Sequence, residues 1–409
     1  MARAAAPRGI SIVEGGSATT PAGFIAGAVY AGIKTSGDGK LDLGILASDR
    51  PAAAAAMFTK NAVKGDAVVV SQEHVRNGRA RAVIVNAGVS NVANGPQGRL
   101  DAEEMCALAA AKLGIEAREV LVGSTGVIGK PLPMRRIRDG VPAIRLRPDG
   151  GHDFARAIMT TDTRPKTMAV RFRGGGRAYT IGAVAKGVGM IHPDMATMFC
   201  FLTTDAPVEP RFLRRALRAA VDDSLNMISV DGDTSTSDTA AIFANGAAGG
   251  RPIDVAHPTA AAFERALRFV CVEMAKMLAR DGEGAEKLIE VRIEGAATRR
   301  EARAAARTVT ASPLVKTAVH GNDPNWGRLM MAVGRSGARV KLDRARAWLG
   351  ATMVFRGRPL PFDEARASDE LRRETVLLRV DLGAGRASAT AWGCDMTPEY
   401  VHINSDYTT

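Results

Sequence analysis

The stretch that organises the chain lies almost at its midpoint and reads Lys186-Gly187-Val188-Gly189-Met190-Ile191-His192-Pro193-Asp194-Met195-Ala196-Thr197. Apolar runs typical of strands lie on both sides of it, from Tyr179 to Ala185 and from Met198 to Leu202. Its glycines let the backbone approach a reacting centre closely. Thr197 follows the small Ala196, so its hydroxyl could attack the preceding peptide bond, and the freed α-amine could then serve as its base. A threonine between strands is more often a plain turn residue, so both interpretations stay open at this point.

Length and composition describe a large globular chain. Its 409 residues are enough for two or three domains, and 46% of them are hydrophobic. No apolar run approaches the roughly 18 residues that span a membrane. The first nine residues are basic but contain no apolar core, which predicts a short disordered arm and not a secretory signal.

Charge and cysteine content indicate the kind of partner and the compartment. The formal net charge is +12, but the basic residues are scattered and no aromatic residues interleave with them, which argues against nucleic-acid binding. A positive field could still attract anionic substrates. The four cysteines form no CxxC pair, so we expect buried free thiols and a cytoplasmic protein.

The first half of the chain alternates short apolar runs with polar, glycine-rich segments. Residues 1–20 are expected to be irregular and residues 86–95 to form a loop, because the latter are rich in Asn and Gly. A helix is predicted over Leu100–Leu113, with acidic residues in its first turn. The strands predicted here are Phe24–Lys34 and Leu41–Ser48 as a hairpin, Val68–Ser71, Ala82–Asn86, Glu119–Val122, and Met168–Phe172 with Tyr179–Ala185 as a second hairpin.

The second half follows a similar pattern and adds long amphipathic helices. Helices are predicted over Phe212–Leu225, Ala260–Ala279 and Thr298–Thr308. Strands are predicted over Lys287–Ile293, Ala351–Phe355, Val376–Leu382, Ser388–Trp392 and Val401–Ile403.

Several polar motifs interrupt these elements. The run from Asp231 to Thr239 has the spacing of a calcium loop but lacks its Gly and Glu, so we expect no metal there and interpret it as a hydrogen-bonded loop. Glu283 lies between two glycines, either as part of a helix cap or facing a ligand amine. His320 opens a polar loop that reaches Arg328, and we interpret it as structural.

The midpoint motif resembles the signature of the ornithine acetyltransferase family, the bifunctional glutamate N-acetyltransferases of arginine biosynthesis. In that family a precursor cuts itself before the threonine of a Met-Ala-Thr-Met run, which here is Met195-Ala196-Thr197-Met198. The resemblance runs from Phe24 to Thr409. It implies cleavage between Ala196 and Thr197, giving chains 1–196 and 197–409. It also implies a layered α/β sandwich of mixed sheets and helices, with a smaller α+β domain in the C-terminal half.

The resemblance also implies roles for particular residues. Thr197 would be the nucleophile, and Thr125 with Gly126 would form the oxyanion hole. The substrate would be bound by Thr161, Lys186, Thr197, Glu283, Asn404 and Thr409. Thr160 and Thr163 are rivals to Thr161 within the same Thr-Thr-Asp-Thr run.

The activity so implied is acetyl transfer from N2-acetyl-L-ornithine to L-glutamate through acetyl-Thr197, with no metal and no cofactor. Acetyl-CoA is a further candidate donor. The two cut chains are expected to stay together, as a heterotetramer of two each. Two other classes are weighed: a self-cleaved N-terminal-nucleophile aminopeptidase or amidohydrolase, and a binding module without enzymatic activity.

Overall fold

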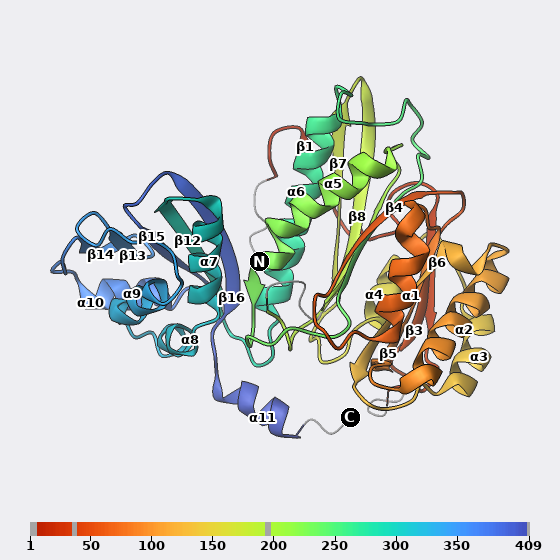
Figure 1. Ribbon diagram of the computed structural model, residues 1–409, viewed down its shortest axis with the longest axis horizontal. Coiled ribbons are helices and arrows are strands. Elements are labelled where there is room, and N and C mark those ends of the chain that lie inside the picture. The colour runs from red at the N-terminus through yellow and green to blue at the C-terminus, as the bar shows by residue number, and fades with distance from the viewer. Residues whose placement is uncertain (1–5, 35–38, 193–197, 407–409) are drawn as a thin grey trace.

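The computed structural model describes residues 6–34, 39–192 and 198–406, which fold into layers of sheets and helices with a smaller lobe beside them (Figure 1). The first sheet has the order β1-β7-β8-β9-β11-β4. Its strands are β1 (Ile10–Val13), β4 (Ala53–Phe58), β7 (Lys166–Gly174), β8 (Arg177–Lys186), β9 (Phe199–Thr204) and β11 (Thr239–Ala244). The antiparallel neighbours β8 and β9 lie on either side of the midpoint stretch, so both flanks of the predicted cut belong to one sheet.

A second sheet with the order β2-β3-β5-β6 packs face to face against the first. Its strands are β2 (Phe24–Val29), β3 (Leu43–Ser48), β5 (Ala82–Val89) and β6 (Val120–Val127). Because successive side chains of a strand point to opposite faces, Phe199 and Phe201 enter the core between the sheets, while Cys200 and Leu202 face the outer helices. Val83 and Leu121 contribute to the same inner core from the second sheet.

Helices cover the outer faces of both sheets, which gives a helix–sheet–sheet–helix arrangement (Figure 1). The first sheet is covered by α5 (Pro210–Asp222) and α6 (Ala260–Arg280). The second sheet is covered by α1 (Asp66–His74), α2 (Gly95–Leu113) and α3 (Met134–Ala143). The short helix α4 (Gly151–Ala157) packs on β2 and β3. Local signals fix the start of α5, because Pro210 occupies its first turn and the Glu209 side chain accepts a hydrogen bond from Phe212 N. Single 3-10 turns are η1 (Val75–Asn77), η2 (Ala117–Glu119) and η3 (Leu225–Met227).

The smaller lobe is built on a third sheet, with the order β10-β16-β12-β15-β13-β14. Its strands are β10 (Ile228–Ser229), β12 (Leu288–Ala296), β13 (Arg346–Leu349), β14 (Thr352–Arg356), β15 (Thr375–Asp381) and β16 (Ala387–Cys394). Its helices are α7 (Arg299–Thr310), α8 (Pro313–His320), α9 (Trp326–Gly334) and α10 (Glu364–Leu371); α11 (Pro398–Asp406) follows β16 and extends away from the lobe (Figure 1). The layered α/β architecture with a smaller α+β C-terminal domain is therefore confirmed.

Some elements differ from the sequence-based prediction. Val68–Ser71 belongs to α1 and Val401–Ile403 to α11, so two predicted strands are helices. A short apolar run has no periodicity that separates a strand from a helix turn, which explains both errors. Residues 1–20 were expected to be irregular but contain β1, and residues 86–95 include the end of β5 and the first residue of α2.

Two further boundaries are corrected by the structure. The strand predicted to end at Val122 continues in β6 as far as Val127. The polar loop predicted from His320 to Arg328 begins with the last residue of α8 and ends inside α9.

None of the helices in the described part of the chain has both the length and the apolar character that a membrane span requires.

Candidate active site

The candidate site forms where β6 and β8 end, at the border between the two stacked sheets. Lys186, the last residue of β8, donates a hydrogen bond from Nζ to Oγ1 of Thr125 in β6, at 2.9 Å. Both side chains are buried, and Lys186 is only 2% exposed. The structure thus brings together two residues that lie 61 positions apart in the sequence.

Burial is the main electrostatic influence on Lys186. It lowers the pKa of the ammonium below its usual value, and the neighbouring positive charge of Lys166 acts in the same direction. The carboxylates of Asp162, Asp238 and Glu283 oppose this shift. The site therefore holds a lysine whose proton is less tightly bound than in water.

Gly126 follows Thr125 with a backbone conformation that only glycine adopts readily. Its φ is +130°, and a Cβ atom at this position would lie 2.2 Å from the carbonyl carbon of Gly88 on the paired strand β5. Gly88 itself has a φ of +121°. The two glycines allow β5 and β6 to run closely together up to the site, so the glycine-rich character noticed in the sequence has a steric cause.

A second group of side chains surrounds the carboxylate of Glu283. Thr161 Oγ1 donates to Glu283 Oε1 at 2.8 Å, and Asn404 Nδ2 of α11 donates to Glu283 Oε2 at 2.9 Å. A Cβ atom on Gly189 would lie 2.5 Å from Glu283 Oε2, so the glycine makes room for the carboxylate. Three residues expected from the resemblance, Thr161, Glu283 and Asn404, therefore lie together, and Thr161 rather than its neighbours contacts the carboxylate.

Beneath these residues lies a buried ionic cluster that the sequence analysis did not assign. Lys166 Nζ lies 2.6 Å from both Asp162 Oδ1 and Asp281 Oδ2. Burial raises the pKa of Asp162, but Lys166, Lys186 and the N–H of Gly187 outweigh it, so the net shift is downward. Thr163 donates its backbone N–H to Asp281, which places this threonine in the support of the site. The sequence signal that could have predicted this cluster is Lys166, four residues after the aspartate of the Thr-Thr-Asp-Thr run.

The polar run that follows β10 binds the backbone on both sides of residues 193–197. Asp231 accepts hydrogen bonds from the backbone N–H groups of Met190 and Ile191, the latter at 2.9 Å. Asp238 Oδ1 accepts from Met198 N at 2.8 Å, and burial raises the pKa of this carboxyl well above its usual value. The sequence expectation of a hydrogen-bonded loop here is confirmed, and Asp238 is a site neighbour that the sequence analysis had not singled out.

Lys34 is another neighbour that was missed. Burial lowers its pKa to about 8, Asp42 opposes the shift, and the charge of Lys186 reinforces it. Its Nζ donates to the backbone carbonyl of Leu41 at 2.8 Å. A Cβ atom on Gly88 would lie 3.0 Å from the backbone nitrogen of Lys34, so Lys34 lies beside the paired glycines of the site. A lone lysine at the end of a predicted strand gave no signal of this.

Three residues named in the sequence analysis, Ala196, Thr197 and Thr409, lie outside the described residues. The described structure ends at Ile191 and His192 on one side of the cleavage motif and resumes at Met198 on the other. Met198 is buried beside Asp238. The expected nucleophile is therefore bracketed in sequence by residues whose positions are defined.

The described groups suit chemistry at an acyl carbon. A hydroxyl beside a lysine can stabilise a developing oxyanion, and a carboxylate with hydroxyl and amide neighbours can bind an amine. An α/β fold with this site defines an enzyme of the acyl-transfer class. The chain belongs to the ArgJ family, whose model matches residues 25–409.

Two relatives agree with this assignment. The arginine biosynthesis bifunctional protein ArgJ of Symbiobacterium thermophilum is 52% identical over 397 residues, which cover 96% of this chain and 99% of the relative. The protein of the same name from Dehalococcoides mccartyi is 48% identical over 401 residues, covering 98% and 99%. A crystal structure of the ArgJ protein of Bacillus halodurans is 41% identical, with a TM-score of 0.49, and covers 51% of this chain and 98% of its own.

Proposed function

We propose that this chain transfers an acetyl group from N2-acetyl-L-ornithine to L-glutamate, through an acetyl ester on Thr197. Membership of the ArgJ family supports this proposal, and so do relatives named as bifunctional enzymes of arginine biosynthesis. The observation that carries it within this chain is the Lys186–Thr125 contact, which lies at the end of the strand leading into the Ala196-Thr197 motif.

The first step of the proposed mechanism is self-cleavage. Thr197 Oγ attacks the carbonyl carbon of Ala196, the C–N bond breaks, and the peptide becomes an ester with a free α-amine on Thr197. Water then opens the ester and releases the carboxylate of Ala196. Two chains result, residues 1–196 and 197–409.

The second step uses the new α-amine, whose usual pKa of about 7.7–8.0 suits a general base near neutral pH. It takes the proton of Thr197 Oγ as this oxygen attacks the acetyl carbon of N2-acetylornithine. The amide C–N bond breaks, and the leaving ornithine amine receives the proton. Glutamate then attacks the carbonyl carbon of acetyl-Thr197 with its free amine. The ester C–O bond breaks, and a proton from the attacking amine passes through the α-amine to Thr197 Oγ, which regenerates Thr197. Because donor and acceptor use one site in turn, the kinetics are expected to be ping-pong.

Lys186 gives Thr125 a defined orientation in this mechanism. An ammonium can only donate hydrogen bonds, and a hydroxyl has a single proton to donate. Since Lys186 Nζ donates to Thr125 Oγ1, the hydroxyl proton of Thr125 is left for another acceptor. We assign that acceptor as the oxyanion formed at the acetyl carbon, with the backbone of Gly126 as the second contributor.

Glu283 is proposed to bind the amine of the amino-acid substrate. Its carboxylate is held by Thr161 and Asn404, so its position does not depend on substrate. Thr409 completes the substrate contacts in this proposal. The cut chains are proposed to remain associated, as a heterotetramer of two each, and to act in the cytoplasm; the four cysteines are free and buried, which agrees with a reducing compartment.

The test is an acetylation assay on purified protein, with N-acetylornithine and acetyl-CoA supplied separately as donors to glutamate. Transfer from N-acetylornithine is the expected result, and transfer from acetyl-CoA would add the second activity. Release of free acetate or hydrolysis of peptides, without acetylglutamate, would replace the proposal by the self-cleaved hydrolase alternative.

A further inference from the structure

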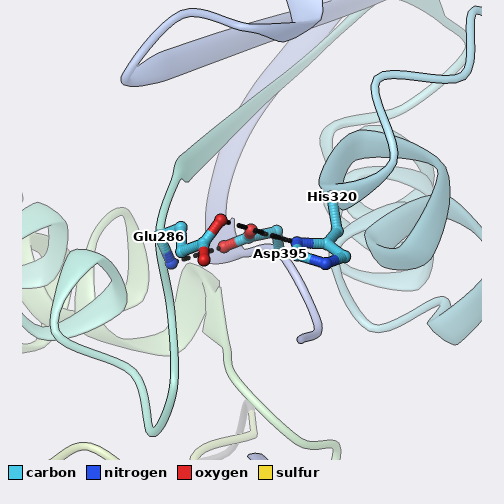
Figure 2. A group of neighbouring side chains, drawn as sticks. All are labelled: Glu286, His320 and Asp395. Carbon is cyan, nitrogen blue, oxygen red and sulfur yellow. Dashed lines mark hydrogen bonds and ion pairs between the residues drawn. The ribbon is translucent and has the colours of Figure 1, made fainter. Parts of the chain in front are cut away.

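A cluster of three metal-ligating side chains lies in the smaller lobe, outside the contacts described above (Figure 2). Glu286 stands just before β12, His320 is the last residue of α8, and Asp395 directly follows β16. Their ligand atoms all lie within 4.8 Å of one another. The cluster thus joins three separate segments of the lobe at one point.

The spacing of the atoms fits a tetrahedral metal ion. His320 Nδ1 lies 3.4 Å from Asp395 Oδ2 and 3.6 Å from Glu286 Oε2. Zinc binds nitrogen and carboxylate oxygen at about 2.0–2.2 Å, which places neighbouring ligand atoms of a tetrahedron about 3.3–3.6 Å apart. The two measured separations therefore need little adjustment to receive such an ion.

The hydrogen bonding of the cluster gives independent support. Asp395 Oδ1 accepts the backbone N–H groups of Glu286 and Lys287, at 2.9 and 2.8 Å, so the carboxylate is fixed. Its other oxygen, Oδ2, and His320 Nδ1 are both buried and make no hydrogen bond within the described part of the chain. Buried polar atoms without a hydrogen bond are uncommon, and these two face each other only at ion-pair distance, 3.4 Å.

The nearby ammonium of Lys287 does not fill this role. Its Nζ donates to the carbonyl of Val319 at 2.8 Å and to Asn322 Oδ1 at 2.6 Å, so it is engaged at the end of α8. The Asp395 side chain is fully buried, whereas those of His320 and Glu286 are 33% and 64% exposed. The cluster is therefore anchored on its buried side and accessible from solvent on the other.

We propose that Glu286, His320 and Asp395 bind a divalent transition cation of the zinc class. The imidazole favours zinc-like ions over calcium or magnesium, and water would occupy the fourth position. The ion would link β12, α8 and the segment after β16. The last segment leads to α11, and there Thr397 Oγ1 donates to the carbonyl of Gly284 at 2.8 Å, next to Glu283.

The experiment measures zinc binding to the purified, tag-free protein after removal of metal with a chelator. Calorimetric titration should show one zinc per copy of the smaller lobe, and zinc should raise the thermal unfolding temperature because it binds the folded state. Cobalt in place of zinc should give the visible absorption of a tetrahedral site.

Two variants, His320→Gln and Glu286→Gln, should each weaken zinc binding at least about tenfold. Asp395 is left intact because its Oδ1 holds two backbone groups. His152→Gln is the matched control: it removes a histidine far from the cluster in sequence that contacts the Gly15 carbonyl, and it should bind zinc like the parent. Unaltered zinc affinity in both cluster variants, or the absence of stoichiometric binding by the parent, would overturn the proposal and leave a His320–Asp395 ion pair. None of these measurements depends on acetyl transfer.

Discussion

Lys186 and Thr125 come from strands of different sheets, yet their side chains are joined by a buried hydrogen bond of 2.9 Å. The contact connects the end of the strand that enters the cleavage motif with the residue expected to stabilise the oxyanion. It also fixes which way the Thr125 hydroxyl can donate. The predictions below start from this geometry.

Thr125→Ala should lower turnover by roughly 10²-fold, since one oxyanion donor is lost. The apparent affinity for N-acetylornithine should change much less, because that hydrogen bond strengthens mainly in the transition state. Steady-state kinetics would measure both quantities. Thr125→Ser is the control that keeps the hydroxyl and should retain most of the turnover. A rise in KM with turnover intact would move Thr125 to a binding role.

Thr197→Ala should leave the chain uncut and without acetyl transfer, because the nucleophile of both steps is lost. Denaturing electrophoresis and sequencing of the second chain would detect cleavage at Ala196. Thr197→Ser keeps a hydroxyl and should retain part of both functions. Normal transfer by Thr197→Ala, or full activity of an intact parent chain, is incompatible with the proposed mechanism.

Gly189→Ala should displace the Glu283 carboxylate, because the new Cβ would lie 2.5 Å from its Oε2. The far end of a glutamate can move, so we expect a folded protein with weakened substrate binding. The KM for both amino-acid substrates should rise more than turnover falls. Gly176→Ala is a comparison variant in a hairpin turn where no atom of the described residues lies within 4 Å of the added Cβ, although its φ of +79° is also unfavourable. Equal kinetic effects from both variants would mean that general strain, not Glu283, is responsible.

Several of the elements that carry the site could be predicted from local signals in the sequence. The hairpins β2–β3 and β7–β8 and the helices α5 and α6 follow from periodicity and turn residues, which are local. α1 could not be recognised, because its Val-Val-Val run suits a strand and its helical form is fixed by packing on β6, where Ser71 Oγ donates to Val122 O.

The contacts between site residues could not be predicted from local sequence, because they join residues that only the fold brings together. Thr161 and Glu283 are 122 positions apart, and Glu283 and Asn404 are 121 apart. Nothing in spacing or composition places them together, and only the family resemblance named them. Lys166 and Asp281 belong to no motif that was recognised, although they form a buried ion pair next to the site.

Lys34 gives a prediction about pH. Its pKa is about 8 in the folded protein, against a usual value of about 10.4 in an unfolded chain. Between these two values Lys34 is more protonated in the unfolded state than in the folded state, so the free energy of unfolding rises with pH from about 8 to 10. As the pH falls again, this stabilisation is lost by about pH 8. The Lys34→Met variant lacks the contribution of Lys34 to this pH dependence. The stability of the variant relative to the parent should therefore be greatest below about pH 8 and should decline above it.

Denaturant midpoints measured from pH 7 to 10 would test this. Lys130→Met, at an exposed lysine, is the control and should differ from the parent by a constant amount. A parallel shift of the Lys34→Met and parent curves at every pH would show that Lys34 is not desolvated in the folded protein.

The C-terminal segment provides the last prediction. The residues of α11 are exposed or half-buried, and the helix is tied to the site through Asn404, whose Nδ2 donates to Glu283 Oε2 at 2.9 Å. Chain ends fray unless they are held, so this contact suggests that the segment has a purpose at the site. Removal of residues 404–409 should leave cleavage at Ala196 intact, because no substrate takes part in that step, yet largely abolish acetyl transfer.

Two smaller changes separate the contributions within this segment. Asn404→Ala should raise the KM for N-acetylornithine, because Glu283 loses one of the two side-chain donors seen among the described residues. Removal of residues 407–409 alone keeps that contact and tests Thr409 by itself. Cleavage, scored by electrophoresis, and transfer, scored by acetylglutamate formation, should therefore respond differently in all three proteins. If the chain lacking 404–409 kept parental kinetics for both substrates, neither Asn404 nor Thr409 would belong to the site, and Glu283 would bind its ligand with Thr161 as its only side-chain support among the contacts described.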